Sequence, residues 1–233
     1  MNIINNIRKT LKSNANEEIK ESSKRYFKEK VKVYGTKTAF VSRLAKDSYE
    51  KIENLSKKEV FALCETLFQS GYMEESFIAC TWANQKIDEF EIKDIEIFEE
   101  WVDRYIDNWA KCDTFCNHTI GDYLEKFPLN VKVLKKWAKS DNLWLRRASS
   151  VSLILPARRG DFLKDVFEIA DILLLDKEDL VQKGYGWMLK EESRKHEKEV
   201  FDYIMKNKKV MPRTALRYAI EKMPKNLKAL AME

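Results

Sequence analysis

Three stretches of the chain combine large aromatic rings with charged groups at a spacing that could build a reactive site. Trp109 and Asp113 are four residues apart, so a helix would place both on one face. Downstream, Arg147 adds a guanidinium and Trp187 a second large ring. A carboxylate between aromatic faces stabilises a cation, and a fixed guanidinium binds a phosphate group. This combination would suit a positively charged sugar beside a phosphate backbone, provided that the fold brings the helices together.

The elements that must position these residues are predicted to be helices. The chain has 233 residues but only 6 Gly and 4 Pro, fewer than sheets joined by tight turns usually need. Apolar periodicity and capping signals instead predict an all-α chain. The predicted helices are 2–13, 17–31, 37–52, 57–68, 73–87, 93–106, 109–127, 130–139, 143–155, 161–175, 177–190, 197–208 and 213–222.

Several helix boundaries are specified by single residues. Ser56 followed by Glu59 forms a capping box, and Thr36 and Asn108 are expected to cap the helices that follow them. Pro156 is expected to end the helix that contains Arg147. These boundaries place Trp109 in the first turn of its helix.

The helices fall into neighbouring pairs joined by short loops. From Ser56 onward one pair takes roughly 36–40 residues, a period typical of HEAT-like repeats. We therefore expect one domain over residues 1–233, a solenoid of antiparallel helix pairs with a concave groove. Gly184 and Gly186 lie inside a predicted helix, where each costs roughly 1 kcal/mol relative to Ala, so a close approach of DNA or of a neighbouring helix should require them.

Charge is distributed unevenly along the chain, whose net charge is +5. Residues 86–107 contain nine acidic and three basic residues, whereas residues 132–159 contain eight basic residues and one acidic residue. A surface facing a polyanion would produce this asymmetry, although a solvated run of charges does so too. Arginine pairs beside aromatic residues favour nucleic acid, so the predicted groove is expected to be basic.

Four motifs follow one another along the chain: Trp109-x-x-x-Asp113, Trp144-x-Arg146-Arg147, Lys183-Gly184-x-Gly186-Trp187 and Arg213-x-x-Leu216-Arg217-Tyr218-Ala219. In their order and spacing they resemble the AlkD-type DNA alkylation-repair glycosylases of the AlkC/AlkD HEAT-like repeat superfamily. The likeness extends over most of the chain. It implies a HEAT-like repeat protein that removes positively charged N3- and N7-alkylpurines from duplex DNA.

The resemblance also implies roles for individual residues. Asp113 would be the catalytic carboxylate, Trp109 and Trp187 the aromatic walls against the deoxyribose of the lesion, and Arg147 the residue that holds the adjacent phosphate. Further basic residues are expected to bind DNA phosphates, which supply most of the affinity for DNA. These are Arg146, Arg158, Arg159, Lys183, Arg213 and Arg217.

A single carboxylate is sufficient for this reaction. Ordinary glycosidases use two carboxylates, but a cationic base leaves as a neutral molecule without a protonating acid. Asp113 could then stabilise the sugar cation and orient the attacking water. A covalent mechanism would need a desolvated lysine, and nothing in the sequence marks the candidates Lys111 and Lys183 as buried. We therefore expect monofunctional hydrolysis that leaves an abasic site and uses no cofactor.

The start of the chain does not have the pattern of a signal peptide, and no run approaches the roughly 20 apolar residues of a membrane span. We expect a cytoplasmic monomer, nucleoid-associated when bound to DNA, with no membrane contact and no required protein partner. The four cysteines are expected to be buried thiols. A metal at Cys112, Cys116 and His118 is not expected, because no second ligand pair at a standard spacing accompanies them.

Two alternatives to the enzyme remain. The chain could be a non-catalytic HEAT-repeat module that grips damaged or branched DNA, or a protein-binding scaffold without salt-dependent affinity for DNA. Asp113 beside Trp109 favours the enzyme.

Overall fold

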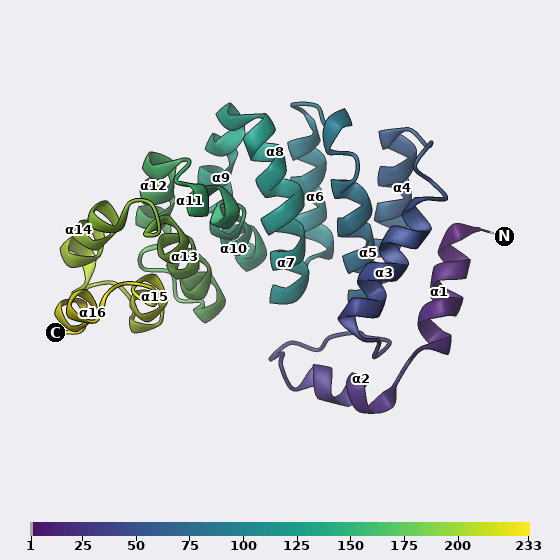
Figure 1. Ribbon diagram of the computed structural model, residues 1–233, viewed down its shortest axis with the longest axis horizontal. Helices are drawn as coiled ribbons and strands as arrows, with labels where there is room; N and C mark the ends of the chain where they lie inside the picture. The colour runs from purple at the N-terminus through teal and green to yellow at the C-terminus, as the bar shows by residue number, and fades with distance from the viewer. Residues whose placement is uncertain (1) are drawn as a thin grey trace. The chain divides into compact units, whose positions relative to one another are not determined.

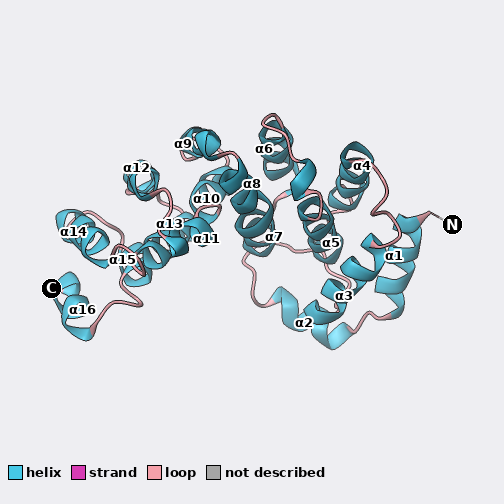
Figure 2. Cartoon of the chain, turned by 45° about the horizontal axis from the view of Figure 1, so that its top comes forward, coloured by secondary structure: helices cyan, strands magenta, loops and turns pink. Residues whose placement is uncertain are grey.

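The computed structural model describes residues 2–233 (Figure 1). Its regular structure is helical (Figure 2), and within the described residues strand-like pairing is limited to one isolated bridge between Lys32 and Tyr72. The prediction of an all-α chain is confirmed. The chain divides into two compact units, the first ending at Phe115 and the second being Cys116–Glu233. Throughout residues 2–233, each helix is too short or too polar to span a lipid bilayer.

Over its described residues, 2–115, the first unit contains seven α-helices and one short 3₁₀-helix, Ile87–Glu89. The α-helices are α1 (Ile3–Ser13), α2 (Glu17–Lys24), α3 (Thr38–Tyr49), α4 (Lys57–Phe68), α5 (Met73–Asn84), α6 (Asp94–Tyr105) and α7 (Trp109–Phe115). Within this unit α5 packs against α3, α4 and α7.

The second unit begins with a π-helix, Cys116–Ile120, and has a 3₁₀-helix at Pro128–Asn130. Its α-helices are α8 (Gly121–Lys126), α9 (Val131–Trp137), α10 (Leu143–Val151), α11 (Ile154–Arg159), α12 (Leu163–Leu173), α13 (Asp179–Glu192), α14 (Glu197–Asn207), α15 (Arg213–Ala219) and α16 (Lys225–Met232). The central helix is α13, which packs against α10, α11, α12 and α15.

The helix pairs repeat along the chain in the way that HEAT-like architecture requires. Successive pairs begin at Lys57, Asp94, Val131, Leu163 and Glu197. Partners in sequence are also partners in space, since α4 packs on α5, α9 on α10 and α12 on α13. The predicted helical-repeat solenoid is therefore confirmed as the fold class. The single domain over residues 1–233 and the basic groove stay predictions.

Aromatic rings fill the centre of the first unit. Phe61, Phe68, Phe98, Trp101 and Phe115 lie with ring centroids 5.2–6.0 Å apart, mostly edge-on or tilted. Phe115 comes from the last turn of α7 and is fully buried. Burial of such a ring is worth roughly 1.5–3 kcal/mol. The core of the unit therefore holds α7 in place.

The predicted helix 17–31 is wrong in its second half, because α2 ends at Lys24. Residues 25–37 connect α2 to α3 without an α-helix, and we call this segment the α2–α3 connection. The backbone N–H groups of residues 34–36 donate to the buried carboxylate of Glu74 at 2.9–3.2 Å. This carboxylate lies far away in the sequence, so no local pattern indicates that it would hold the connection.

Thr36 does not cap α3, contrary to the prediction. The N-cap residue of α3 is Lys37, and no side chain makes the capping hydrogen bond. Thr36 instead binds Glu74, as part of the same anchored segment. The neighbouring Gly35 has a φ of +88°, and a Cβ there would lie only 2.4 Å from the carbonyl oxygen of Asn16. A glycine is therefore required at this bend.

Three further boundaries differ from the predictions. The helix predicted over 109–127 passes through the π-helix before it continues as α8. Pro156 does not end a helix but lies in the first turn of α11, where the missing N–H is tolerated. The last helix, α16, has no counterpart among the predicted elements. In contrast, the capping box of Ser56 and Glu59 is confirmed.

Candidate functional site

Asn108 starts α7, as predicted. Its side-chain oxygen accepts the backbone N–H of Lys111 at 3.0 Å, and the Asn108 side chain is itself buried. The buried ring of Phe115 fixes the inward face of the helix. As a result, Trp109 and Asp113 are both half-buried, four residues apart on the part of α7 that is not committed to the core.

Trp109 has an aromatic partner that the sequence analysis missed. The ring of Phe27, from the α2–α3 connection, stacks on it with centroids 5.2 Å apart and an interplanar angle of 21°. Phe27 lies within the predicted helix 17–31, in the half that is not helical. The signal that could have found it is the Tyr26-Phe27 doublet, aromatic residues set in a strongly charged stretch.

Lys111 lies on the inner side of α7 and is almost fully buried, at 1% exposed. Its ammonium group donates to the carbonyl oxygen of Gly71 at 3.0 Å and pairs with the carboxylate of Asp107 at 2.9 Å. The sequence alone had not marked this lysine as buried. Its amine is bound within the first unit by these two contacts.

Arg147, in the second unit, is buried on α10 with 4% of its surface exposed. Its guanidinium donates to the backbone carbonyl of Leu180 in the first turn of α13. Asn142 caps α10 and accepts the backbone N–H of Trp144 at 2.8 Å. Arg147 therefore ties α10 to α13, the helix that carries Trp187.

The two glycines of α13 are explained by helix packing. A Cβ at Gly184 would lie 2.8 Å from the hydroxyl oxygen of Ser150 on α10. A Cβ at Gly186 would lie 2.7 Å from both the carbonyl oxygen of Ala215 and the Cβ of Tyr218 on α15. Of the two explanations expected for these glycines, the close approach of neighbouring helices is confirmed.

Trp187 follows these glycines and is half-buried on α13. The ammonium group of Lys190, one turn on, lies 5.7 Å from the centre of the indole, within the range of a cation–π contact. Because α13 packs closely on α15, the exposed Arg213 and Arg217 of α15 belong to the same helix layer as Trp187.

The predicted catalytic residues thus form two groups. Trp109 and Asp113 belong to the first unit, and Arg147 and Trp187 belong to packed helices of the second. Each group is held by contacts within its own unit. The meeting of the two groups at one site stays a prediction.

Residues 7–223, nearly the whole chain, match the sequence profile of the family described as DNA alkylation repair enzyme. The chain belongs to the DNA alkylation repair enzyme family. A similar solved structure is titled a predicted DNA alkylation repair enzyme from Enterococcus faecalis. The two chains are 17% identical, with a TM-score of 0.81 over 91% of this chain and 97% of that one. At this identity the structural likeness shows the fold alone. A search of curated proteins gave no match.

Membership of the DNA alkylation repair enzyme family confirms the resemblance found in the motifs. It gives the chain a role in DNA repair and makes DNA its expected partner. The reaction, the lesion and the roles of the individual side chains are finer statements, and we treat them below as proposals.

The six basic residues expected to bind DNA phosphates differ in whether a carboxylate of the chain already pairs with them. Four of the six form ion pairs: Arg146 with Asp176 at 2.6 Å, Arg158 with Glu191 at 2.8 Å, Lys183 with Asp179 at 2.7 Å, and Arg159 with Glu125. Within residues 2–233, Arg213 and Arg217 have no carboxylate partner, and both are exposed. We therefore rank the two arginines of α15 first as phosphate contacts.

Proposed function

We propose that the chain is a monofunctional DNA glycosylase that hydrolyses the N-glycosidic bond of positively charged N3- or N7-alkylpurines in duplex DNA. Family membership supports DNA repair as the setting. The observation that carries the proposal is local: α7 carries the carboxylate of Asp113 and the ring of Trp109, both half-buried and four residues apart.

In the proposed reaction the bond between C1′ of the deoxyribose and the purine nitrogen breaks, and its electron pair goes to the base. Because the alkylated base starts as a cation, it leaves neutral and needs no acid. Positive charge develops on the sugar, where the Asp113 carboxylate stabilises it. Water then adds to C1′ and loses a proton to Asp113 or to solvent, which leaves an abasic site.

The aromatic and basic residues have supporting roles in this proposal. Trp109, backed by Phe27, and Trp187 each stabilise the sugar cation by roughly 0.5–2 kcal/mol. Arg147 holds a neighbouring phosphate.

Hydrolysis is favoured over a covalent lyase mechanism by the state of the two candidate lysines. The buried Lys111 is bound to the carbonyl oxygen of Gly71 and to the exposed carboxylate of Asp107. Lys183 is paired with Asp179 at 2.7 Å. Both amines are held in ion pairs, whereas a Schiff base requires an amine that is free to attack the sugar.

The test is the release of 7-methylguanine from a duplex by the wild-type chain and by Asp113→Asn. We expect the variant to lose about 10²–10³-fold or more in single-turnover rate, because it removes the charge that the transition state needs. Asp47→Asn is the matched control, since Asp47 is exposed on α3 of the same unit. Its rate should equal that of the wild-type chain.

The other outcomes separate the alternatives. Release that persists in Asp113→Asn would remove Asp113 from the reaction. No release above spontaneous depurination by the wild-type chain, with salt-dependent duplex binding intact, would instead make the chain a non-catalytic DNA-binding member of its family.

A further inference from the structure

A cavity of about 620 Å³ lies in the first unit beside the α2–α3 connection. Five lysines line it: Lys12, Lys20, Lys24, Lys30 and Lys32. Glu17 is the single acidic residue in the lining. The cavity is separate from the residues to which the proposed reaction assigns roles, and we call it the lysine cavity.

The lysines of this cavity are only partly neutralised. Lys20 pairs with Glu17 at 3.1 Å and Lys24 with Glu21 at 2.5 Å, on the exposed side of α2. Lys12 and Lys30 have no carboxylate partner in the described part of the chain. The cavity therefore holds an excess of positive charge that an anion would neutralise.

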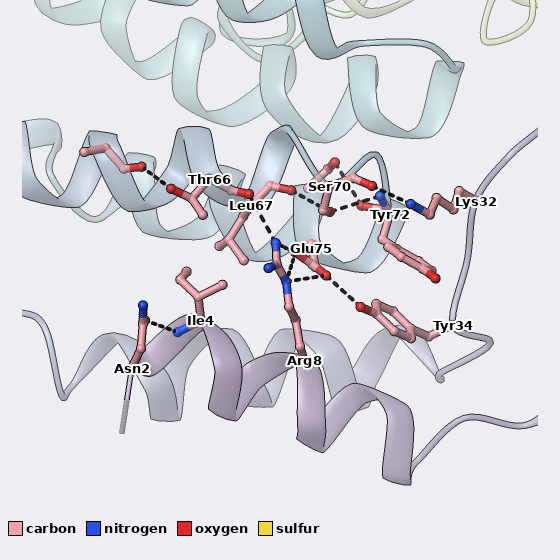
Figure 3. Close-up of polar contacts among 12 residues, drawn as sticks. Asn2, Ile4, Arg8, Lys32, Tyr34, Thr66, Leu67, Ser70, Tyr72 and Glu75 are labelled. Carbon is pink, nitrogen blue, oxygen red and sulfur yellow. Dashed lines mark hydrogen bonds and ion pairs between the residues drawn. The ribbon is translucent and has the colours of Figure 1, made fainter.

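One wall of the cavity is rigid. Figure 3 shows the buried carboxylate of Glu75 between Arg8 and the hydroxyl of Tyr34, which it binds at 3.0 and 2.7 Å. Lys32 donates to the carbonyl oxygen of Ser70 at 2.9 Å. These contacts hold the segment that carries Lys32 against α5.

The aromatic residues of the cavity leave no room for a stacked base. The ring of Tyr72 stacks on Tyr34 with centroids 3.9 Å apart. The ammonium group of Lys32 lies over the same ring, 4.3 Å from its centre. A stacked ring and an ammonium group cannot share one face, so both faces of Tyr72 are occupied. The site therefore suits phosphate groups rather than bases.

The same segment of chain connects the lysine cavity to Trp109. Phe27 stacks on Trp109, and Lys30 of the cavity follows only three residues later. Three residues span at most about 10 Å. One strand of B-DNA carries a phosphate about every 3.4 Å of helix axis, so a strand that passes Trp109 meets the lysine cavity within a few nucleotides.

We propose that the lysine cavity binds the phosphodiester backbone of the DNA that flanks the lesion. The inference rests on the proposed function only in taking duplex DNA as the partner. It adds a phosphate-binding site in the first unit, whereas every phosphate contact expected from the sequence lies in the second. Its contribution is to affinity and placement, not to the breaking of the bond.

The test measures binding of an unmodified 20-base-pair duplex as a function of salt by the charge-reversal variant Lys12→Glu/Lys30→Glu. The matched control is Lys46→Glu/Lys58→Glu, an equal change of charge at exposed lysines of α3 and α4 that do not line the cavity. We expect about tenfold weaker binding and a loss of roughly 2 from the log–log salt slope in the cavity variant alone.

A milder variant, Lys12→Gln/Lys30→Gln, repeats the measurement if charge reversal disturbs folding, and thermal unfolding checks both. Equal losses in the cavity and control variants would overturn the proposal. So would tight binding of inorganic pyrophosphate at the cavity with duplex affinity unchanged, because the occupant would then be a free polyphosphate.

Base excision is scored separately from binding. With enzyme below saturation, the cavity variant should release 7-methylguanine more slowly than the wild-type chain, whereas the control variant Lys46→Glu/Lys58→Glu should match the wild-type rate. If the wild-type chain releases no base while the cavity variant loses duplex affinity, the glycosylase proposal fails and the DNA site stands.

Discussion

At the scale of single residues, Glu192 is a buried carboxyl group that the proposed reaction does not use. It lies at the end of α13, and neither of its oxygens has a hydrogen-bond partner. Burial, together with repulsion from Asp161 and Glu199, raises its pKa to about 8. The ring of His196 lies 3.6 Å away and is charged only when it is protonated. In the folded chain Glu192 is therefore mostly protonated at neutral pH.

This pKa predicts how stability depends on pH. Between the ordinary value of 4.5 and about 8 the folded state binds the Glu192 proton more tightly than the unfolded state, so this group's contribution to stability falls as pH rises. Glu192→Gln removes that loss. The free energy of unfolding of the variant minus that of the wild-type chain should rise by about 2–4 kcal/mol from pH 5.5 to pH 8.5. Urea unfolding at the two pH values measures this change. A difference that is the same at both pH values would show that the carboxyl titrates normally.

At the scale of elements, close helix contacts fix the layer that contains Trp187. Gly184 lets α13 approach α10, and Gly186 lets it approach α15. The obstacles to a larger residue differ in kind. A Cβ at Gly184 meets the hydroxyl of Ser150, a small side chain, whereas a Cβ at Gly186 meets the backbone carbonyl of Ala215. One contact can be relieved by a second substitution and the other cannot.

The two glycines should therefore respond differently to replacement by alanine. We expect Gly186→Ala to lower the free energy of unfolding by roughly 1–3 kcal/mol, because strain from overpacking exceeds the gain of about 1 kcal/mol in helix propensity. Gly184→Ala should be destabilised too, but Ser150→Ala should restore most of the loss. Urea unfolding of the single and double variants measures these changes in stability. If Ser150→Ala does not restore stability, the obstacle to a Cβ at position 184 is the backbone and not the hydroxyl of Ser150.

At the scale of the whole molecule, ion pairing determines which basic residues are available to bind DNA phosphates. The basic run over residues 132–159 reads in the sequence as a surface for a polyanion. In the structure much of it is paired, as with Arg158 on Glu191 and Lys135 on Asp165 and Glu168. Arg213 and Arg217, which lie outside that run, are exposed and have no carboxylate partner in the described residues. Local charge density is therefore a poor guide to phosphate binding in this chain.

The salt dependence of duplex binding tests this ranking. Arg213→Gln/Arg217→Gln should lower the log–log salt slope by about 2, since each phosphate contact contributes about 0.9. Arg158→Gln/Arg159→Gln removes the same charge from arginines that are already paired, and should change the slope by less. The reverse order would show that the ion pairs of α11 open when DNA binds.

What the sequence by itself determined are the features that depend on neighbours along the chain. Helical periodicity and capping predicted most of the helices, the start of α7 at Asn108 and the shared face of Trp109 and Asp113. The motif order predicted the family. These features need only hydrogen bonds and side-chain contacts a few residues apart, so they are legible without a fold.

The tertiary structure decided what depends on partners distant in the sequence. Glu74, some forty residues away, anchors the end of the α2–α3 connection, and Phe27 of the same connection stacks on Trp109, which is distant in the sequence. Distant carboxylates likewise neutralise arginines that look available in the sequence. A buried charge must find a partner wherever the fold supplies one, and periodicity along the chain carries no information about where that is.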